Sequence, residues 1–274
     1  MSGFLDEMAR SSAERVAAAM RHETAAALEQ RARLAPPAPA LRLSAAFDVI
    51  AELKLRSPAA GILGSQQQDW LGRVAAYARA GAAAVSVLTE PTRFDGSLEH
   101  LQRAAQVLRP LQVPAMRKDF IVDPYQLLEA RAAGAGGVLL ILRMLPRDRI
   151  VKLLDVAAAH RLFVLLEAFD AADLESAREL LSARPRGESA VLVGINSRDL
   201  RTLKVAPERF ADLAPRLPLG WPAVAESGVA TPADARTMMQ LGYRIALIGT
   251  ALMASDDPSG LLAEIFTATR TAQS

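Results

Sequence analysis

The sequence ends three apolar runs with side chains that can donate or accept a proton. Glu52 and Lys54 close the first run, FDVIAELK, and they point the same way because side chains alternate along a strand. Lys118 and Glu167 each close a later run. Charged groups are costly to bury at such places unless they are paired or used, so general acid–base chemistry is indicated. The alternative for Glu52 and Lys54 is a structural salt bridge.

Lysine is rare in this chain, which carries most of its positive charge on arginine. Among the 32 basic residues only four are lysines, namely Lys54, Lys118, Lys152 and Lys204. Arginine keeps its proton in proteins whereas a buried lysine can titrate, so a lysine at a strand end indicates a transferable proton. We predict that apolar walls lower the pKa of Lys118 and make it a general acid. Lys152 and Lys204 are interpreted as solvated charges.

Two later runs end with a glycine beside a hydroxyl residue. They are Glu226-Ser227-Gly228 and Ile248-Gly249-Thr250. Glycine lets backbone N–H groups approach an anion closely. In enzymes built as a barrel of eight parallel strands, phosphate is commonly bound after the last two strands. We therefore expect a phosphate site here; two plain turns are the alternative.

The residue content disfavours other kinds of site. Cysteine is absent, which excludes thiol nucleophiles, disulfides and cysteine metal sites. The histidines, His22, His100 and His160, fall on predicted helices away from the strand ends, and no acidic cluster has a metal-ligand spacing. We expect neither a histidine-based triad nor a bound metal.

These residues are positioned by apolar strands that alternate with amphipathic helices. Strands that are apolar on both faces imply a parallel sheet covered by helices. Eight such units, with no GxGxxG after the first strand, favour an α/β fold of the closed (β/α)8 TIM-barrel type, whose active sites lie at the carboxyl ends of the strands. We expect residues 1–274 to form a single barrel domain, of which residues 1–43 are an N-terminal helical extension (one helix or two) and a linker. The expected strands are Phe47–Lys54, Ala84–Thr89, Val113–Lys118, Gly137–Leu142, Leu162–Glu167, Val191–Asn196, Pro222–Glu226 and Ile245–Gly249.

Composition narrows the class of protein. The chain has 274 residues, is 51% hydrophobic and carries a net charge of +2, so there is no electrostatic reason to expect a nucleic-acid or membrane partner. No apolar run approaches the roughly 20 residues that span a bilayer, and the N-terminus lacks the apolar core of a signal peptide. We expect a cytoplasmic protein that is a monomer or a weak homo-oligomer.

Taken together, the motifs resemble the indole-3-glycerol phosphate synthase family of tryptophan biosynthesis over nearly all of residues 44–266. Any one of the motifs is modest evidence, but all of them in this order are highly specific. The matching stretches are Ile50-Ala51-Glu52-x-Lys54-x-x-Ser57-Pro58, Leu88-Thr89-Glu90 with Phe94-x-Gly96-Ser97, Arg117-Lys118-Asp119-Phe120-Ile121, Leu166-Glu167, Gly194-Ile195-Asn196-x-Arg198-Asp199-Leu200, Ala225-Glu226-Ser227-Gly228 and Ile248-Gly249-Thr250.

The resemblance implies a lyase that closes the indole ring of 1-(2-carboxyphenylamino)-1-deoxyribulose 5-phosphate, with loss of carbon dioxide and water and without a cofactor. By resemblance, Lys118 protonates the ketone, Glu167 and Lys54 act as base and acid in dehydration, and Glu52 and Asn196 orient hydroxyls and lysines. The implied substrate-binding residues are Ser57, Phe94, Arg198, Glu226, Ser227, Gly228, Gly249 and Thr250. Among them, Ser57, Ser227, Gly228, Gly249 and Thr250 are expected to hold the phosphate.

Departures from the family pattern leave other readings open. Leu55, Ala59, Pro91 and Phe169 stand where the family usually has other residues, and they bear on substrate fit and loop closure more than on the chemistry. The alternatives are a diverged paralogue with a related substrate, a sugar-phosphate aldolase that uses Lys118 as a Schiff-base nucleophile, and a non-catalytic barrel that binds phosphorylated ligands.

Overall fold

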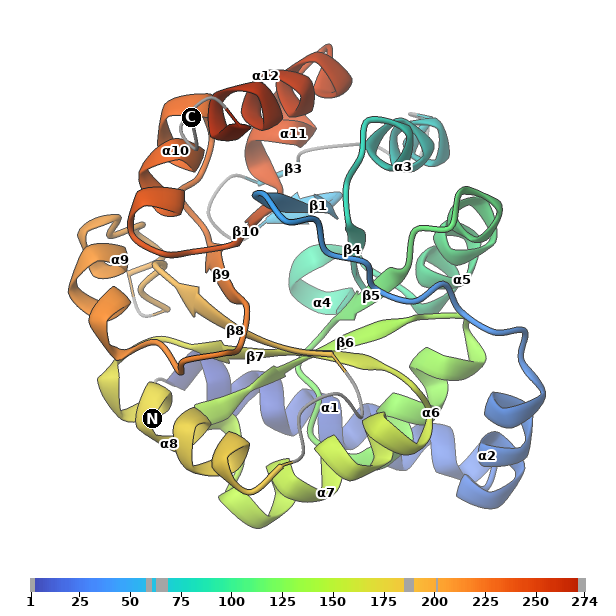
Figure 1. The fold of residues 1–274 in the computed structure, drawn as a ribbon. Coiled ribbons are helices and arrows are strands. Elements are labelled where there is room, and N and C mark those ends of the chain that lie inside the picture. The colour runs from blue at the N-terminus through green and yellow to red at the C-terminus, as the bar shows by residue number, and fades with distance from the viewer. Residues whose placement is uncertain (1–2, 58–60, 63–68, 185–189, 201, 271–274) are drawn as a thin grey trace.

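A barrel of parallel strands forms the centre of the molecule (Figure 1). The computed structural model describes residues 3–57, 61–62, 69–184, 190–200 and 202–270. The barrel strands are β1 (Asp48–Leu53), β4 (Ala84–Leu88), β5 (Ala115–Lys118), β6 (Gly137–Ile141), β7 (Phe163–Ala168), β8 (Val191–Asn196), β9 (Ala223–Glu226) and β10 (Ile245–Ile248). In the described part of the chain these strands close in the order β1-β10-β9-β8-β7-β6-β5-β4, and every neighbouring pair is parallel. The predicted TIM barrel is therefore confirmed.

Helices surround the strands, as Figure 1 shows in the view along the barrel. The outer helices are α3 (Trp70–Arg79), α5 (Leu98–Leu108), α6 (Pro124–Ala132), α7 (Arg147–Ala159), α8 (Ala171–Ser182), α9 (Glu208–Leu213), α10 (Pro232–Gln240) and α12 (Pro258–Arg270). Shorter elements are the hairpin β2 (Arg56–Ser57) and β3 (Gly61–Ile62), the helices α4 (Pro91–Phe94) and α11 (Thr250–Ala254), and the 3₁₀ turns η1 (Arg109–Leu111), η2 (Leu142–Met144) and η3 (Ala214–Arg216). Within the described ranges, no helix is both long enough and apolar enough to cross a bilayer.

Both faces of each strand are buried, for two different reasons. Ile50, Leu165 and Leu192 belong to a cluster inside the barrel. Val49 and Leu166, which alternate with such residues, belong to a second cluster between the strands and the outer helices. This explains why the strands read as continuous apolar runs rather than as an alternation of polar and apolar residues. A charged residue on the inner face therefore has to lie at the open end of the barrel.

Local signals set the ends of the outer helices, and α6 is an example. The side chain of Asp123 accepts a hydrogen bond from the backbone N–H of Tyr125, the side-chain oxygen of Gln126 accepts one from the backbone N–H of Asp123, and Pro124 occupies the first turn. This arrangement satisfies N–H groups that would otherwise have no partner. After the helix, Gly134 adopts a φ of 90°, a conformation in which glycine ends helices without steric cost.

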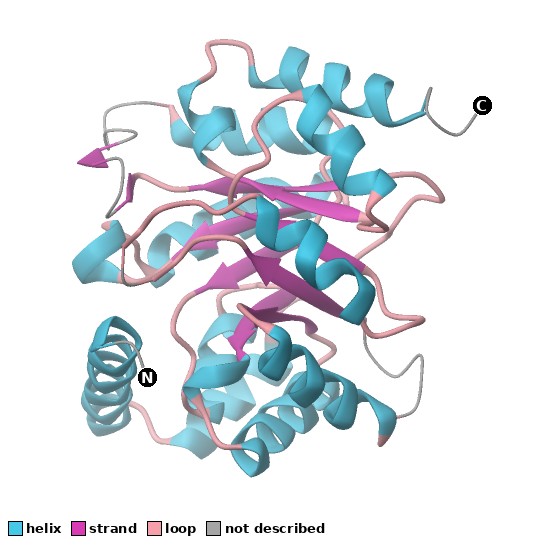
Figure 2. Ribbon diagram, turned by 90° about the vertical axis from the view of Figure 1, so that its left-hand side faces the viewer, coloured by secondary structure: helices cyan, strands magenta, loops and turns pink. Residues whose placement is uncertain are grey.

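The N-terminal extension consists of two helices, α1 (Gly3–His22) and α2 (Ala25–Leu34), separated by the cap residue Thr24. Figure 2 shows α1 on the side of the molecule toward which the strand arrowheads point. Its Leu5 and Met8 are buried in the same cluster as the residues that fill the barrel interior. Helix α1 is therefore packed against the end of the barrel at which the active site is expected, whereas Leu28 and Ala32 of α2 pack with Tyr125 and Leu128 of the outer helix α6.

A buried ion-pair network at Asp119 ties α1 to the barrel. Arg15 of α1 binds both carboxylate oxygens of Asp119, at 3.1 and 2.8 Å, and Arg117 Nη2 lies 3.0 Å from Oδ2. The Thr89 hydroxyl donates to the same oxygen at 2.7 Å. Burial opposes ionisation of Asp119, but Arg117, Arg15 and Thr89 outweigh it and hold the pKa of this carboxyl well below its usual range. Because Arg117 and Asp119 flank Lys118, the network also fixes the backbone that carries Lys118.

We predict that Arg15→Ala lowers the free energy of unfolding by about 2 kcal/mol, because it takes one partner from a buried carboxylate while Arg15 itself is partly exposed. Urea unfolding measures the loss. Arg93→Ala is the matched control, because its pair with Glu7 also ties α1 to the barrel but both side chains are about half exposed. Its loss should stay within about 0.5 kcal/mol. Equal losses in the two variants would contradict the assigned importance of the buried pair.

Candidate active site

One cavity of about 430 Å³ opens at the carboxyl ends of the strands. It brings together nearly all of the predicted site residues, which come from distant parts of the chain. Those that line it are Glu52, Lys54, Phe94, Lys118, Glu167, Asn196, Arg198, Glu226, Ser227, Gly228, Gly249 and Thr250. Ser57 lies in β2, where its backbone pairs with Gly61, and its side chain is outside the described part of the structure.

Glu52 and Lys54 form an ion pair at the edge of the cavity, with 2.9 Å between Lys54 Nζ and Glu52 Oε1. Burial would raise the pKa of Glu52, but Lys54, Lys118 and Arg198 outweigh it and the pKa is lowered. The second oxygen of Glu52 has no hydrogen-bond partner among the described residues. The pair is thus a salt bridge that still presents a free acceptor, so the two readings made from the sequence are compatible.

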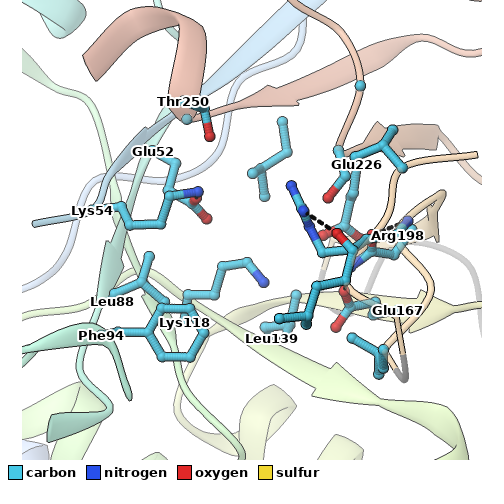
Figure 3. Close-up of a pocket in the computed structure, with 18 of the residues that line it drawn as sticks. Glu52, Lys54, Leu88, Phe94, Lys118, Leu139, Glu167, Arg198, Glu226 and Thr250 are labelled. Atoms are coloured by element: carbon cyan, nitrogen blue, oxygen red, sulfur yellow. Dashed lines mark hydrogen bonds and ion pairs between the residues drawn. The ribbon is translucent and has the colours of Figure 1, made fainter. Parts of the chain in front are cut away.

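Lys118 extends into the middle of the cavity, between Glu52 and Lys54 on one side and Glu167, Glu226 and Arg198 on the other (Figure 3). Burial alone would lower its pKa, as the sequence suggested. The carboxylates of Glu167, Glu52 and Glu226 outweigh burial, so the pKa of Lys118 is raised. The predicted direction was therefore wrong, because the apolar walls of the barrel come with three negative charges that no single segment reveals. Lys118 is held as an ammonium ion.

Glu167 ends its inner-face run on β7 beside Asn196 of β8. The amide of Asn196 donates to Glu167 Oε1 at 2.5 Å, and its own oxygen accepts the backbone N–H of Arg198 at 2.9 Å. Asn196 is therefore oriented at both ends, and it leaves the second carboxylate oxygen of Glu167 to the cavity. This geometry suits a carboxylate that accepts a proton from a ligand at one defined oxygen atom.

Glu226, the last residue of β9, is the least compensated charge of the site. It is only 1% exposed, and neither carboxylate oxygen has a hydrogen-bond partner among the described residues. Burial first, and then the negative charge of Glu167, raise its pKa well above the ordinary value, while Lys118 opposes the shift. A proton is therefore held on Glu226 far more readily than on a solvated glutamate.

Arg198 follows β8 and reaches the cavity from the opposite side to Lys54 (Figure 3). Its Nη1 donates to the carbonyl of Leu203 at 2.7 Å, which fixes the side chain. A guanidinium carries further N–H donors. Burial lowers its pKa, and Glu52 opposes this shift. A guanidinium in this position can bind a carboxylate of a ligand.

The two predicted phosphate turns lie side by side at the end of neighbouring strands, β9 and β10. Ser227 and Gly228 both adopt left-handed backbone conformations, with φ of 63° and 98°, and the Ser197 hydroxyl holds the carbonyl of Ser227 at 2.5 Å. Gly249 precedes α11, whose exposed first residue is Thr250. Gly249 has a second reason to be glycine, because a Cβ there would come within 2.5 Å of Glu52 Oε1.

Apolar side chains that the sequence did not single out as wall residues complete the cavity. Phe120 packs edge-on against Phe4 of α1, with ring centroids 5.7 Å apart, and lies 6.2 Å from Phe94. Of these three rings, only Phe94 had been expected among the substrate-binding residues. The other apolar lining residues include Leu88, Leu139, Ile141, Phe169, Leu200, Leu203 and Leu247. Their positions at the carboxyl ends of inner-face runs are the sequence signal that could have identified several of them.

Some residues at the strand ends have structural tasks instead. Glu90 caps α4 by accepting the backbone N–H groups of Thr92 and Arg93. Arg143 pairs with Asp170 and Asp173 and lies over the ring of Phe169, 4.9 Å from its centroid. The charged residues at the carboxyl ends of the strands therefore do not all belong to the site, and the sequence does not distinguish those that cap helices from those that could react.

Most of the residues that depart from the expected motif pattern have packing or helix-end positions in the structure. Leu55 is 6% exposed and belongs to the outer core, and Pro91 is the first residue of α4 after its cap. Phe169 is buried and lines the cavity. Ala59 lies outside the described residues. Among the three described positions, Phe169 is the one that lines the cavity.

The three histidines lie away from this site. His22 ends α1, His100 lies in α5 and His160 follows α7, and none of them lines the cavity. Among the residues that the structure describes, no group of three or more His, Cys, Asp or Glu side chains is arranged to hold a metal ion.

Comparison with known proteins gives a consistent result. The family model described as indole-3-glycerol phosphate synthase matches residues 5–265. Among curated proteins, the indole-3-glycerol phosphate synthase of Parafrankia sp. (strain EAN1pec) is 43% identical over 251 residues, covering 90% of this chain and 89% of that protein. The protein of the same name from Leifsonia xyli subsp. xyli (strain CTCB07) is 40% identical over 266 residues, covering 96% and 95%.

Two solved structures are similar to this chain at the level of the fold. The 3-hexulose-6-phosphate synthase from Salmonella typhimurium superposes with a TM-score of 0.63 at 11% identity, covering 82% of this chain and 99% of that one. A thiamine phosphate pyrophosphorylase from Pyrococcus furiosus gives a TM-score of 0.59 at 15% identity, covering 83% and 98%. These likenesses agree with the barrel and carry no inference about substrate.

We predict that Glu226→Gln stabilises the protein at neutral pH by about 1–3 kcal/mol, because at that pH the buried carboxyl is costly either to leave ionised or to keep protonated, and the neutral amide avoids both costs. The folded state binds the Glu226 proton more tightly than the unfolded state, so the free energy of unfolding falls as pH rises from near 4.5 through the raised pKa. The glutamine variant escapes this fall, and its advantage should therefore grow across that range. Urea unfolding at several pH values measures it.

Glu264→Gln on the exposed side of α12 is the matched control for this measurement, and its difference from the parent protein should not change with pH. An advantage of Glu226→Gln that stays constant or shrinks with rising pH would show that folding does not raise the pKa of Glu226.

Proposed function

The chain belongs to the indole-3-glycerol phosphate synthase family, and from this we propose that it closes the indole ring of 1-(2-carboxyphenylamino)-1-deoxyribulose 5-phosphate by general acid–base catalysis. Enzymes of this name are carboxy-lyases of tryptophan biosynthesis that act on a small phosphorylated substrate. The proposal extends to the individual steps and to the residues that perform them.

In the first step Lys118 acts as the general acid. The ring carbon that bears the carboxylate attacks the ketone carbon, and the carbonyl oxygen takes a proton as its electron pair leaves the double bond. An ammonium ion in the centre of the cavity is suited to this task, since it can stabilise the developing oxyanion and then transfer the proton. The raised pKa of Lys118 keeps the group charged until an alkoxide accepts its proton.

Loss of carbon dioxide restores the aromatic ring, and a dehydration then completes the indole. The hydroxyl left by the former ketone departs as water with a proton from an acid, while a base takes a proton from the adjacent methylene carbon. We assign Lys54 as the acid and Glu167 as the base. Asn196 directs Glu167 through its hydrogen bond, and Glu52 orients Lys54 through their ion pair. These steps transfer only protons and electron pairs within the substrate, so they call for no cofactor.

Binding of the substrate is assigned to the two sides of the cavity. Arg198, with Lys54, is the proposed partner of the anthranilate carboxylate, and the cluster of Phe94, Phe120 and Phe4 provides an apolar wall for the aromatic ring. The hydroxyls and backbone N–H groups of the turns after β9 and β10 are proposed to hold the phosphate. The proposed phosphate ligands are Ser57, Ser227, Gly228, Gly249 and Thr250.

The observation that supports the proposal most strongly is the convergence of Lys118 with Glu52, Glu167 and Glu226 in one cavity. A barrel that only binds a phosphorylated ligand has no need for an ammonium ion among three buried carboxylates, each of which is costly to desolvate. The same convergence disfavours a Schiff-base aldolase, because a lysine with a raised pKa is a poor nucleophile.

We predict that borohydride in the presence of substrate does not link the substrate to Lys118. Mass spectrometry of the treated protein checks this, with a Lys118→Ala sample as the reference. A substrate-sized adduct on Lys118 would support the Schiff-base reaction instead, since reduction traps only a covalent imine.

The direct test is the appearance of indole-type fluorescence when the purified protein meets 1-(2-carboxyphenylamino)-1-deoxyribulose 5-phosphate. We predict that Lys118→Ala lowers kcat by at least about a thousandfold, since it removes both the acid and the oxyanion partner. Binding of a phosphate-bearing substrate analogue should persist, because the proposed phosphate turns are untouched. Lys152→Ala, on the exposed face of α7, is the matched control and should retain activity.

Absence of fluorescence with the unaltered protein would reject the proposed reaction. Comparable turnover by Lys118→Ala and the unaltered protein would reject the role of Lys118 while leaving the reaction itself in place.

A further inference from the structure

Gly194 lies on the inner face of β8, and none of the roles described above explains why this residue is a glycine. Leu192, two residues earlier, lies in the inner core, and Asn196, two residues later, lines the cavity, so position 194 also faces inward. Its neighbours across the sheet are Glu167 on β7 and Val224 on β9. Gly194 is paired in regular strand and has no left-handed φ, so the backbone conformation does not require glycine here.

The reason for glycine is the carboxylate of Glu226. A Cβ built at position 194 would overlap Glu226 Oε1 and would lie 3.1 Å from Glu226 Cδ and 3.0 Å from Leu165 Cδ1. The carboxylate thus fills the space that any side chain at position 194 would take. Glu226 lies two residues beyond Val224, so its side chain leans from β9 across to β8 and toward Glu167.

We propose that Gly194 is a positioning residue, whose missing side chain forms a well that holds the carboxylate of Glu226 against β8, beside Glu167 and within reach of Lys118. Its consequence for turnover rests on the proposed function, whereas the placement of the carboxylate does not.

The charged groups around this well determine how displacement of the Glu226 carboxylate would change its protonation. Glu226 faces Glu167 from β7, Lys118 from β5 and Glu52 from β1. In the well it is buried and close to Glu167, and both conditions favour its protonated form. A methyl group at position 194 would push the carboxylate out of the well, toward the open cavity and away from Glu167. Glu226 would then ionise more readily and would enter space that the substrate needs.

The well can be tested by NMR of carboxyl carbons in protein labelled with ¹³C-glutamate, with the Glu226 signal assigned from Glu226→Gln. In the unaltered protein this carboxyl should titrate well above the usual glutamate range, and in Gly194→Ala its midpoint should fall toward that range. Gly137→Ala is the matched control, because a Cβ at position 137 would overlap the ring of Phe163 inside the same barrel and away from the cavity. It should leave the Glu226 titration unchanged.

Turnover provides the second readout. Gly194→Ala should lower kcat by about 10- to 100-fold, as expected for a misplaced group at the reacting centre, whereas folded Gly137→Ala should stay within about threefold of the unaltered enzyme. Glu226→Asp withdraws the carboxylate by one methylene, so it should lower kcat in the native chain and have little further effect in the Gly194→Ala chain. A purely structural role for Gly194 would instead make the two losses multiply.

Stability decides the case in which Gly194→Ala folds poorly. If the clash is with Glu226, then Glu226→Asp should restore the thermal unfolding midpoint of the Gly194→Ala chain. An equally unstable double variant, an unshifted Glu226 titration in Gly194→Ala, or multiplying losses of kcat would each overturn the proposal. If the unaltered protein makes no indole product, the proposed function fails, while the carboxyl titration still decides the role of Gly194.

Discussion

The site depends on the electrostatic cost of bringing carboxylates together inside a barrel from which water is largely excluded. Glu52, Glu167 and Glu226 are each at most 4% exposed, and all three lie around the ammonium group of Lys118. Their charges raise the pKa of Lys118, while burial and the charge of Glu167 raise the pKa of Glu226. Lys54 and Arg198 bring further positive charge to the same cavity. With Lys118, these cations can attract the phosphate and the carboxylate of the proposed substrate.

The charged side chains of the site have to be held in place, and the alternation of side chains between the two faces of β5 helps to do this. Lys118 faces the cavity, whereas Arg117 and Asp119, its neighbours on either side, face outward into the network that includes Arg15 and Thr89. The same few residues therefore serve chemistry on one face and attachment of α1 on the other. Because α1 also contributes Phe4 to the cavity wall, the extension and the site are parts of one packing arrangement.

Two glycines contribute to this site because they lack a side chain. Gly249 leaves room for the carboxylate of Glu52, and Gly194 leaves room for that of Glu226. Both glycines lie in motifs that the sequence presents, yet a motif does not state which distant side chain occupies the space beside it. Glycine at position 249 had been interpreted as a backbone donor for phosphate, and its second role emerges only when β1 and β10 lie side by side.

By itself the sequence determined the barrel, the strand ranges to within two residues, and the convergence of Lys118, Glu167 and Asn196, because inner-face alternation and βα order are local properties. Only the tertiary structure decided the direction of the Lys118 pKa shift, the use of Glu90 and Arg143 for capping and ion pairing, and the wall formed by Phe4 and Phe120. The physical reason is that electrostatic and packing effects depend on distances between residues far apart in the chain, and closure of the barrel sets those distances.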